Sequence, residues 1–87
     1  MATEQEFQDA AERVKTLTKR PSNDELLKLY ALFKQATTGD ASGKRPSAFK
    51  MKERAKFDAW TGQKGKSKDD ARAAYVALVD ELKAKLG

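Results

Sequence analysis

The chain has 87 residues, no cysteine, no histidine and a formal net charge of +5. The missing residue types exclude disulfide bridges, thiolate nucleophiles, Cys/His zinc sites and imidazole acid–base chemistry. The length predicts a single domain, 1–87, and the positive charge favours an anionic partner such as a nucleic acid, a membrane surface or a phosphorylated small molecule.

The first predicted helix begins at Thr3. Glu6 follows three positions later, and this pair is a capping box, in which each side chain satisfies a backbone N–H of the helix start. The helix is expected to run to about residue 17, because Pro21 disfavours helical geometry at the residue before it. Its buried stripe is predicted to be Phe7, Ala10, Ala11, Val14 and Leu17.

The second predicted helix begins at Ser22, which forms another capping box with Glu25. Gly39 is a natural left-handed stop for this helix. Its stripe is predicted to contain Leu26, Leu29, Tyr30 and Phe33.

Two further helices follow after a polar segment. The third is predicted from residue 50 or 51 to Trp60, ending before Gly62. The fourth begins at Ser67, with Asp70 completing the cap. Its apolar face is the longest of the four and comprises Ala71, Ala74, Tyr75, Leu78, Val79, Leu82 and Leu86.

Loop lengths predict the topology. The connections near 18–21 and 62–66 are short, which favours antiparallel neighbours. The eleven residues 39–49 can span about 36 Å when extended, at about 3.3 Å each. The second helix, of about 16 residues, is only about 24 Å long. This loop can therefore return along the bundle, and we predict an all-α, up-down-down-up four-helix bundle with a crossover between helices two and three.

The sequence offers little for catalysis. Carboxylates lie beside lysines on exposed helix faces, as solvated ion pairs do, and the two capping serines have no base to activate them. No glycine-rich phosphate loop is present. We therefore expect a protein that is not an enzyme and that binds no metal or cofactor.

Two helices carry residues suited to a phosphate. Lys52, Lys56 and Trp60 share one row of the third helix, and Tyr30 and Lys34 lie one turn apart on the second. Taken singly, each residue is more typical of ordinary packing or of a solvated surface. If the two helices are parallel, however, Tyr30, Lys34 and Lys56 meet, and two ammonium groups beside a phenol would bind a phosphate.

Several stretches resemble the acyl-CoA-binding protein family, also called diazepam-binding inhibitor. YALFKQATTGD resembles the family signature, KRPSAF its Arg-Pro crossover loop, KERAKFDAW its third helix, and SKDDARAAYVALVDEL its last helix. The resemblance covers the chain from Phe7 to Leu86. Glu53 stands where the family commonly has glycine, and Phe57 replaces the first of two tryptophans.

The resemblance implies a non-catalytic intracellular carrier in fatty acid metabolism, which binds and pools medium- and long-chain acyl-CoA esters. It assigns Tyr30, Lys34 and Lys56 to the 3′-phosphate and adenine end, and Tyr75 to the flank of the adenine region. Lys15 and Lys52 are implied as further ligand contacts. Ala31, Leu32 and Phe33 would line the same surface, and Leu27 would border the acyl groove.

The expected partners are acyl-CoA esters, without nucleic acid and with transient contacts to membranes or to enzymes that use acyl-CoA. We expect a monomer. We also expect a cytoplasmic location, because the opening MATEQEF lacks the features of a signal peptide and no apolar run approaches the roughly 20 residues of a membrane span. Two alternatives remain at this point: a small basic helical nucleic-acid-binding protein, supported only by charge, and a partner-docking module without a small ligand.

Overall fold

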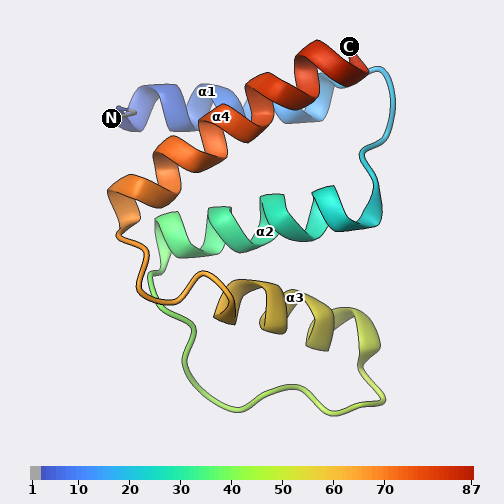
Figure 1. Ribbon diagram of the computed structural model, residues 1–87, viewed down its shortest axis with the longest axis vertical. Helices are drawn as coiled ribbons and strands as arrows, with labels where there is room; N and C mark the ends of the chain where they lie inside the picture. The colour runs from blue at the N-terminus through green and yellow to red at the C-terminus, as the bar shows by residue number, and fades with distance from the viewer. Residues whose placement is uncertain (1–2) are drawn as a thin grey trace.

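The computed structural model describes residues 3–87 and consists, over that range, of helices and connecting segments without a strand. The described residues form four α-helices and one 3₁₀ turn, and Figure 1 shows their arrangement. Their bounds are Glu4–Arg13 for α1, Val14–Thr16 for the 3₁₀ turn η1, Asn23–Thr37 for α2, Met51–Thr61 for α3 and Lys68–Leu86 for α4.

The predicted caps are confirmed. Ser22 accepts a hydrogen bond from the backbone N–H of Glu25 at 3.1 Å, and the Glu25 carboxylate accepts from the Ser22 N–H at 2.8 Å. Thr3 and Glu6 form the same reciprocal pair at the start of α1. Because each box satisfies two donors that the helix itself leaves unpaired, these short local patterns fix where the helices begin.

The expected extent of the first helix was wrong at its C-terminal end. Regular α-helix stops at Arg13, and Val14–Thr16 continue as one 3₁₀ turn. The Thr16 hydroxyl donates to the Arg13 carbonyl oxygen at 2.7 Å, a side-chain bond that competes with the backbone ladder. Val14 and Leu17 nevertheless pack against the core, as the stripe predicted.

The predicted topology is confirmed. In Figure 1, α1 and α4 run in one direction while α2 and α3 run in the other, so α2 and α3 are parallel neighbours. The segment after α2 returns along the outer side of α3 before that helix begins. Because the crossover makes α2 and α3 parallel, residues at similar distances from the start of each helix can face each other.

The core lies among α1, α2 and α4, and α3 stands outside it. Leu32, Val79 and Leu82 are among the most deeply buried side chains. Among the described helices, α3 packs against α2 alone, and it contributes no fully buried residue. Because burial of apolar side chains is the main stabilising term of a fold, α3 needs other attachments.

Polar contacts supply those attachments at the end of α2. Gln35 is buried and its Nε2 donates both to the Asp40 carboxylate at 2.8 Å and to the Lys66 carbonyl at 2.7 Å. The same carboxylate oxygen of Asp40 accepts from the Gly65 N–H at 2.9 Å. Gly39, at a φ of +94° that favours glycine, ends α2, and its carbonyl accepts from Trp60 Nε1 at 2.8 Å.

Candidate functional site

Two rows of side chains face each other across α2 and α3. Tyr30 and Lys34 are one turn apart on α2, and Lys56 and Trp60 are one turn apart on α3. Lys56 Nζ lies 5.4 Å from the centre of the Tyr30 ring, and Lys34 Nζ lies 4.9 Å from the centre of the Trp60 ring. We call these four residues the lysine–aromatic ladder.

The ladder presents its lysines without a carboxylate to neutralise them. Neither Lys34 nor Lys56 takes part in an ion pair within residues 3–87. A cation–π contact at an exposed site stabilises by about 0.5–1 kcal/mol, whereas a hydrogen bond to a charged group contributes about 1.5–3 kcal/mol. An anion that contacts both ammonium groups would therefore bind the two lysines more strongly than the aromatic rings do.

A groove of about 630 Å³ adjoins the ladder between α2 and α3. Its volume falls in the range of small-molecule sites. Tyr30 and Lys56 of the ladder belong to its wall, so one surface carries both the cationic and the apolar parts. The lining residues are Arg20, Asn23, Leu26, Leu27, Tyr30, Met51, Lys52, Ala55 and Lys56.

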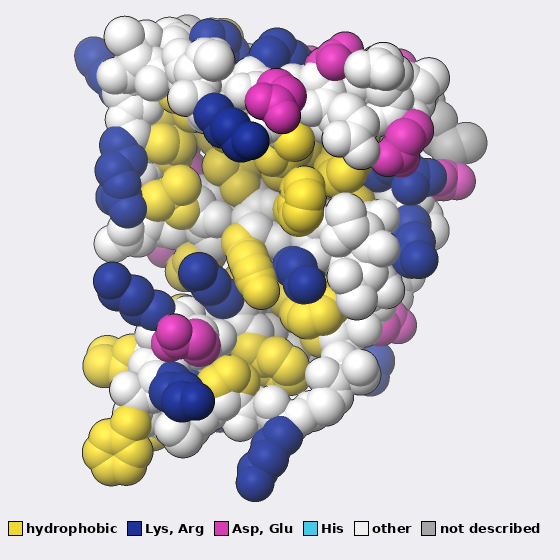
Figure 2. All heavy atoms as spheres, turned by 180° about the vertical axis from the view of Figure 1, so that it is seen from behind, with side chains coloured by type: hydrophobic (Ala, Val, Ile, Leu, Met, Phe, Trp, Pro, Cys, Tyr) yellow, Lys and Arg dark blue, Asp and Glu magenta, His cyan; other side chains and the backbone are white. Residues whose placement is uncertain are grey.

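Figure 2 shows the corresponding surface in space-filling form. Hydrophobic side chains form a band across the middle of this face, with lysine and arginine side chains along it and few acidic ones among them. Such an arrangement suits an amphipathic anion, whose apolar part lies on the band while its charged part meets the basic side chains.

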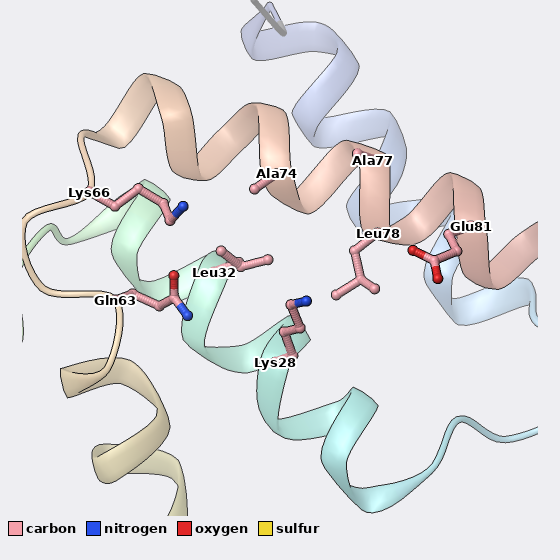
Figure 3. Close-up of a pocket in the computed structure, with 8 residues that line it drawn as sticks. All are labelled: Lys28, Leu32, Gln63, Lys66, Ala74, Ala77, Leu78 and Glu81. Atoms are coloured by element: carbon pink, nitrogen blue, oxygen red, sulfur yellow. The ribbon is translucent and has the colours of Figure 1, made fainter.

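A second, smaller hollow of about 300 Å³ opens on another side of α2, between that helix, α4 and the segment joining α3 to α4. Figure 3 shows its lining, with Lys28 and Leu32 contributed by α2 and Leu78 and Glu81 by α4. Lys28 precedes Tyr30 by two residues, a rotation of about 200° around a helix of 3.6 residues per turn. The two hollows are therefore separate.

The structure places Phe33 and Tyr75 in an aromatic cluster with Phe7, at the junction of α1, α2 and α4. The ring centres of Phe33 and Phe7 are 5.4 Å apart, and Tyr75 meets both rings edge-on at 5.2 and 5.8 Å. Phe33 is 38% exposed, whereas Tyr75 is only 4% exposed. Burial raises the pKa of the Tyr75 hydroxyl, so that side chain stays neutral.

Three other predicted ligand contacts lie away from the ladder and the groove. Ala31 and Leu32 are buried, and Leu32 lines the smaller hollow instead. Lys15 is exposed on η1, and its nearest carboxylate is Glu12 at 3.7 Å. Of the predicted set, the structure thus brings together Leu27, Tyr30, Lys34, Lys52 and Lys56.

Sequence reasoning missed part of the groove. Leu26 packs against the core, as the stripe predicted, but that it also lines the groove with Leu27 was not foreseen. Met51 and Ala55 were not singled out, although they lie one turn apart on the side of α3 that also carries Lys52 and Lys56. The signal available was this i, i+4 apolar pair beside the lysine row.

Two further observations bear on the chemistry of the site. Over the described residues, no group of three or more acidic side chains gathers as metal ligands would. No helix in the same range combines the length and apolar character needed to cross a bilayer.

Comparison with known proteins gives consistent matches over nearly the whole chain. The family described as acyl CoA binding protein matches residues 4–79. Acyl-CoA-binding protein homolog 1 of Caenorhabditis elegans is 62% identical over 81 residues, which is 93% of this chain and 94% of that protein. The acyl-CoA-binding protein of Saccharomyces cerevisiae is 53% identical over 79 residues, 91% of each chain.

Solved structures agree with these matches. The crystal structure of Oryza sativa acyl-CoA-binding protein 2 superposes with a TM-score of 0.89 at 44% identity, covering 93% of this chain and 90% of that one. The Moniliophthora perniciosa protein gives a TM-score of 0.90 at 37% identity, covering 98% and 84%.

Proposed function

The chain belongs to the acyl-CoA-binding protein family, and we propose that it carries medium- and long-chain acyl-CoA esters in the groove and on the ladder described above. The observation that supports this most directly is the ladder itself, whose two lysines form no ion pair within residues 3–87 and whose Tyr30 and Lys56 line the adjoining groove. An acyl-CoA ester has the matching parts: a nucleotide phosphate, an adenine ring and a long apolar tail.

The head group is proposed to bind at the ladder. A phosphate between Lys34 and Lys56 replaces two cation–π contacts with charge-assisted hydrogen bonds, and the Tyr30 hydroxyl adds a neutral donor. The adenine ring has Phe33 beside it as a partly exposed aromatic surface. Tyr75 would then act through Phe33, since its own ring is buried against that residue.

The tail is proposed to lie in the groove, over Leu26, Leu27 and Ala55. Burial of one methylene contributes about 0.8 kcal/mol, so a palmitoyl chain of about 14 methylenes offers about 11 kcal/mol as an upper bound. Three phosphate hydrogen bonds offer about half as much before the lysines are desolvated. The head group therefore selects CoA, and the tail sets most of the affinity.

Isothermal titration of the purified protein with palmitoyl-CoA tests this proposal. Free CoA and free palmitate serve as the two controls, because each carries one of the two parts. We expect one-to-one binding of the ester that is at least a hundredfold tighter than binding of either part. Equal affinity for palmitate and its CoA ester would contradict a role for the ladder.

We further propose that the protein binds acyl-CoA esters without converting them into a product. Basic, aromatic and apolar side chains and one asparagine form the site, and burial, ion pairing and hydrogen bonding account for its proposed action. Chromatography of palmitoyl-CoA after prolonged incubation with the protein should recover the intact ester. Release of free CoA above the rate without protein would contradict a carrier that performs no reaction.

A further inference from the structure

The net positive charge of the chain is concentrated in one short segment. Residues 44–56 contain six lysines and arginines and one glutamate, a net charge of +5. The whole chain also has a net charge of +5, from eighteen basic and thirteen acidic residues, so the rest holds twelve of each sign. The segment comprises the end of the crossover and the first half of α3, and we call it the basic segment.

The same segment exposes two large apolar side chains. Phe49 is 99% exposed and Met51 is 76% exposed, the highest fractions among the large hydrophobic residues described. Exposed apolar side chains grouped within a basic surface are typical of interaction sites. In Figure 2, hydrophobic side chains project at the corner where α3 begins, with lysine and arginine side chains around them.

The segment has a defined conformation. The Lys50 N–H donates to the Ser47 carbonyl at 3.0 Å, which closes the turn that carries Phe49. The Arg45 guanidinium donates twice to the Asp58 carboxylate, at 2.8 and 2.6 Å, and fastens the crossover to α3. Phe49 therefore lies in a hydrogen-bonded turn, with its side chain almost fully exposed.

Its position relative to the groove is informative. Met51, Lys52 and Lys56 belong both to the basic segment and to the groove lining. The groove therefore opens beside the projecting apolar side chains. A flat surface that contacted Phe49 and Met51 would face this opening.

From these observations we propose that the basic segment is a docking surface for a bilayer that contains anionic lipids. Phe49 and Met51 enter the boundary between head groups and acyl chains, and the neighbouring lysines contact lipid phosphates. Basic residues beside an anionic membrane and apolar side chains buried in its interface act together in such binding. Docking does not depend on the proposed carrier function, but it would place the groove opening against the bilayer.

A bilayer fits this surface better than the other anionic partners. A protein partner of the docking type would need a complementary hollow to receive the two projecting side chains. A nucleic acid would use the lysines and could stack one aromatic ring, but it would leave the Met51 side chain in water. An anionic bilayer accepts both apolar side chains and the surrounding charge at once.

Sedimentation with vesicles tests the proposal, using the full chain without acyl-CoA. Vesicles of phosphatidylcholine with 30% phosphatidylserine are compared with vesicles of phosphatidylcholine alone. We expect partitioning onto the mixed vesicles to be about tenfold stronger or more, and to weaken as salt is raised. Equal partitioning onto both vesicle types, or none onto either, would overturn the proposal.

Substitutions outside the groove lining locate the surface. Phe49→Ser and the double variant K44Q/K50Q should each reduce partitioning onto the mixed vesicles by about fivefold or more. The double variant K19Q/K64Q removes the same charge elsewhere and should reduce it less than twofold. If K19Q/K64Q reduces partitioning as much as K44Q/K50Q does, vesicle binding depends on the net charge of the protein and not on the basic segment.

A second measurement reports which part of the protein enters the bilayer. Because the chain has no cysteine, A48C beside Phe49 and A84C on α4 can each carry one environment-sensitive dye. Mixed vesicles should shift the dye emission to the blue at position 48 and leave it unchanged at position 84. Identical shifts at both positions would exclude a defined docking surface.

Solution binding of palmitoyl-CoA separates this proposal from the carrier function. Phe49 is almost fully exposed and does not line the groove, so Phe49→Ser should retain both fold and ester affinity while its partitioning onto mixed vesicles falls by about fivefold or more. Tighter binding of duplex DNA than of mixed vesicles at the same salt concentration, unaffected by Phe49→Ser, would favour nucleic acid instead.

Discussion

Lys34 of α2 holds its ammonium nitrogen 4.9 Å from the centre of the Trp60 ring on α3. The same indole donates its N–H to the carbonyl of Gly39, at the end of α2. The face of the Trp60 ring thus contacts Lys34, the residue proposed to bind a phosphate, and its N–H links α3 to the end of α2. This arrangement allows the proposed binding role of Lys34 to be separated from the structural role of Trp60 by substitution.

Lys34→Ala should weaken palmitoyl-CoA binding by about 1.5–3 kcal/mol, because it removes a charge-assisted contact. The melting temperature should change little, since the cation–π contact it also removes is a weak one. Calorimetric titration and thermal melting measure the two effects. Lys28→Ala is the matched control, because that lysine lines the smaller hollow on another side of α2. A large loss of stability with unchanged affinity would make Lys34 a structural residue.

Trp60→Phe should lower the free energy of unfolding by about 0.5–1.5 kcal/mol, because the Gly39 carbonyl loses its indole donor. The phenyl ring still offers Lys34 an aromatic face, so ester affinity should fall much less than in Lys34→Ala. Trp60 is the only tryptophan, so the variant cannot be followed by tryptophan fluorescence. Urea unfolding of both proteins is therefore measured by circular dichroism. Unchanged stability would show that the hydrogen bond to Gly39 contributes nothing.

Gln35→Glu should lower the free energy of unfolding by about 3–5 kcal/mol at neutral pH. It replaces the amide that donates to Asp40 and to the Lys66 carbonyl with a buried carboxylate close to another carboxylate. Gln63→Glu is the control, because that residue lies on the connection after α3 and is not buried. Equal effects of the two substitutions in urea unfolding would contradict the role assigned to Gln35.

The pKa of Asp40 is lowered from its ordinary value of 3.8 by the Gly65 N–H and then by the Gln35 amide. A lowered folded-state pKa gives stability that is present above the unfolded value and is lost as pH falls through the folded one. Stability should therefore decline below about pH 4. Asp40→Asn should flatten this decline, whereas Asp9→Asn, an exposed residue paired only to Gln5 of the same helix among the described contacts, should not. Unfolding series from pH 2 to 7 provide the test.

Affinity should rise with acyl-chain length by up to about 0.8 kcal/mol per methylene and then level off when the groove is full. Ala55→Leu adds bulk to the groove and should move the plateau to shorter chains without changing the affinity for free CoA. Ala84→Leu, on the exposed side of α4, should leave the series unchanged. An affinity that does not depend on chain length would place the tail outside the groove.

Much of the architecture could be predicted because its causes are local. Ser22 with Glu25 starts α2, Gly39 ends it, and apolar residues three and four positions apart mark the face that packs. The length of the crossover permitted α2 and α3 to be parallel, and the structure has them so. Local chemistry was less decisive at Thr16, where a side-chain bond changes the last turn of the first helix to 3₁₀.

Residue type and spacing by themselves determined four helices, their starts, and the pairing of Tyr30 and Lys34 on one row. Only the tertiary structure decided which side chains stand opposite that row and that Tyr75 is buried against Phe33. It also decided that Gln35 and Asp40 tie the end of α2 to the segment between α3 and α4. The physical reason is range. Caps and stripes depend on neighbours within one or two turns, whereas these contacts depend on the register between helices, which is set by packing over the whole chain.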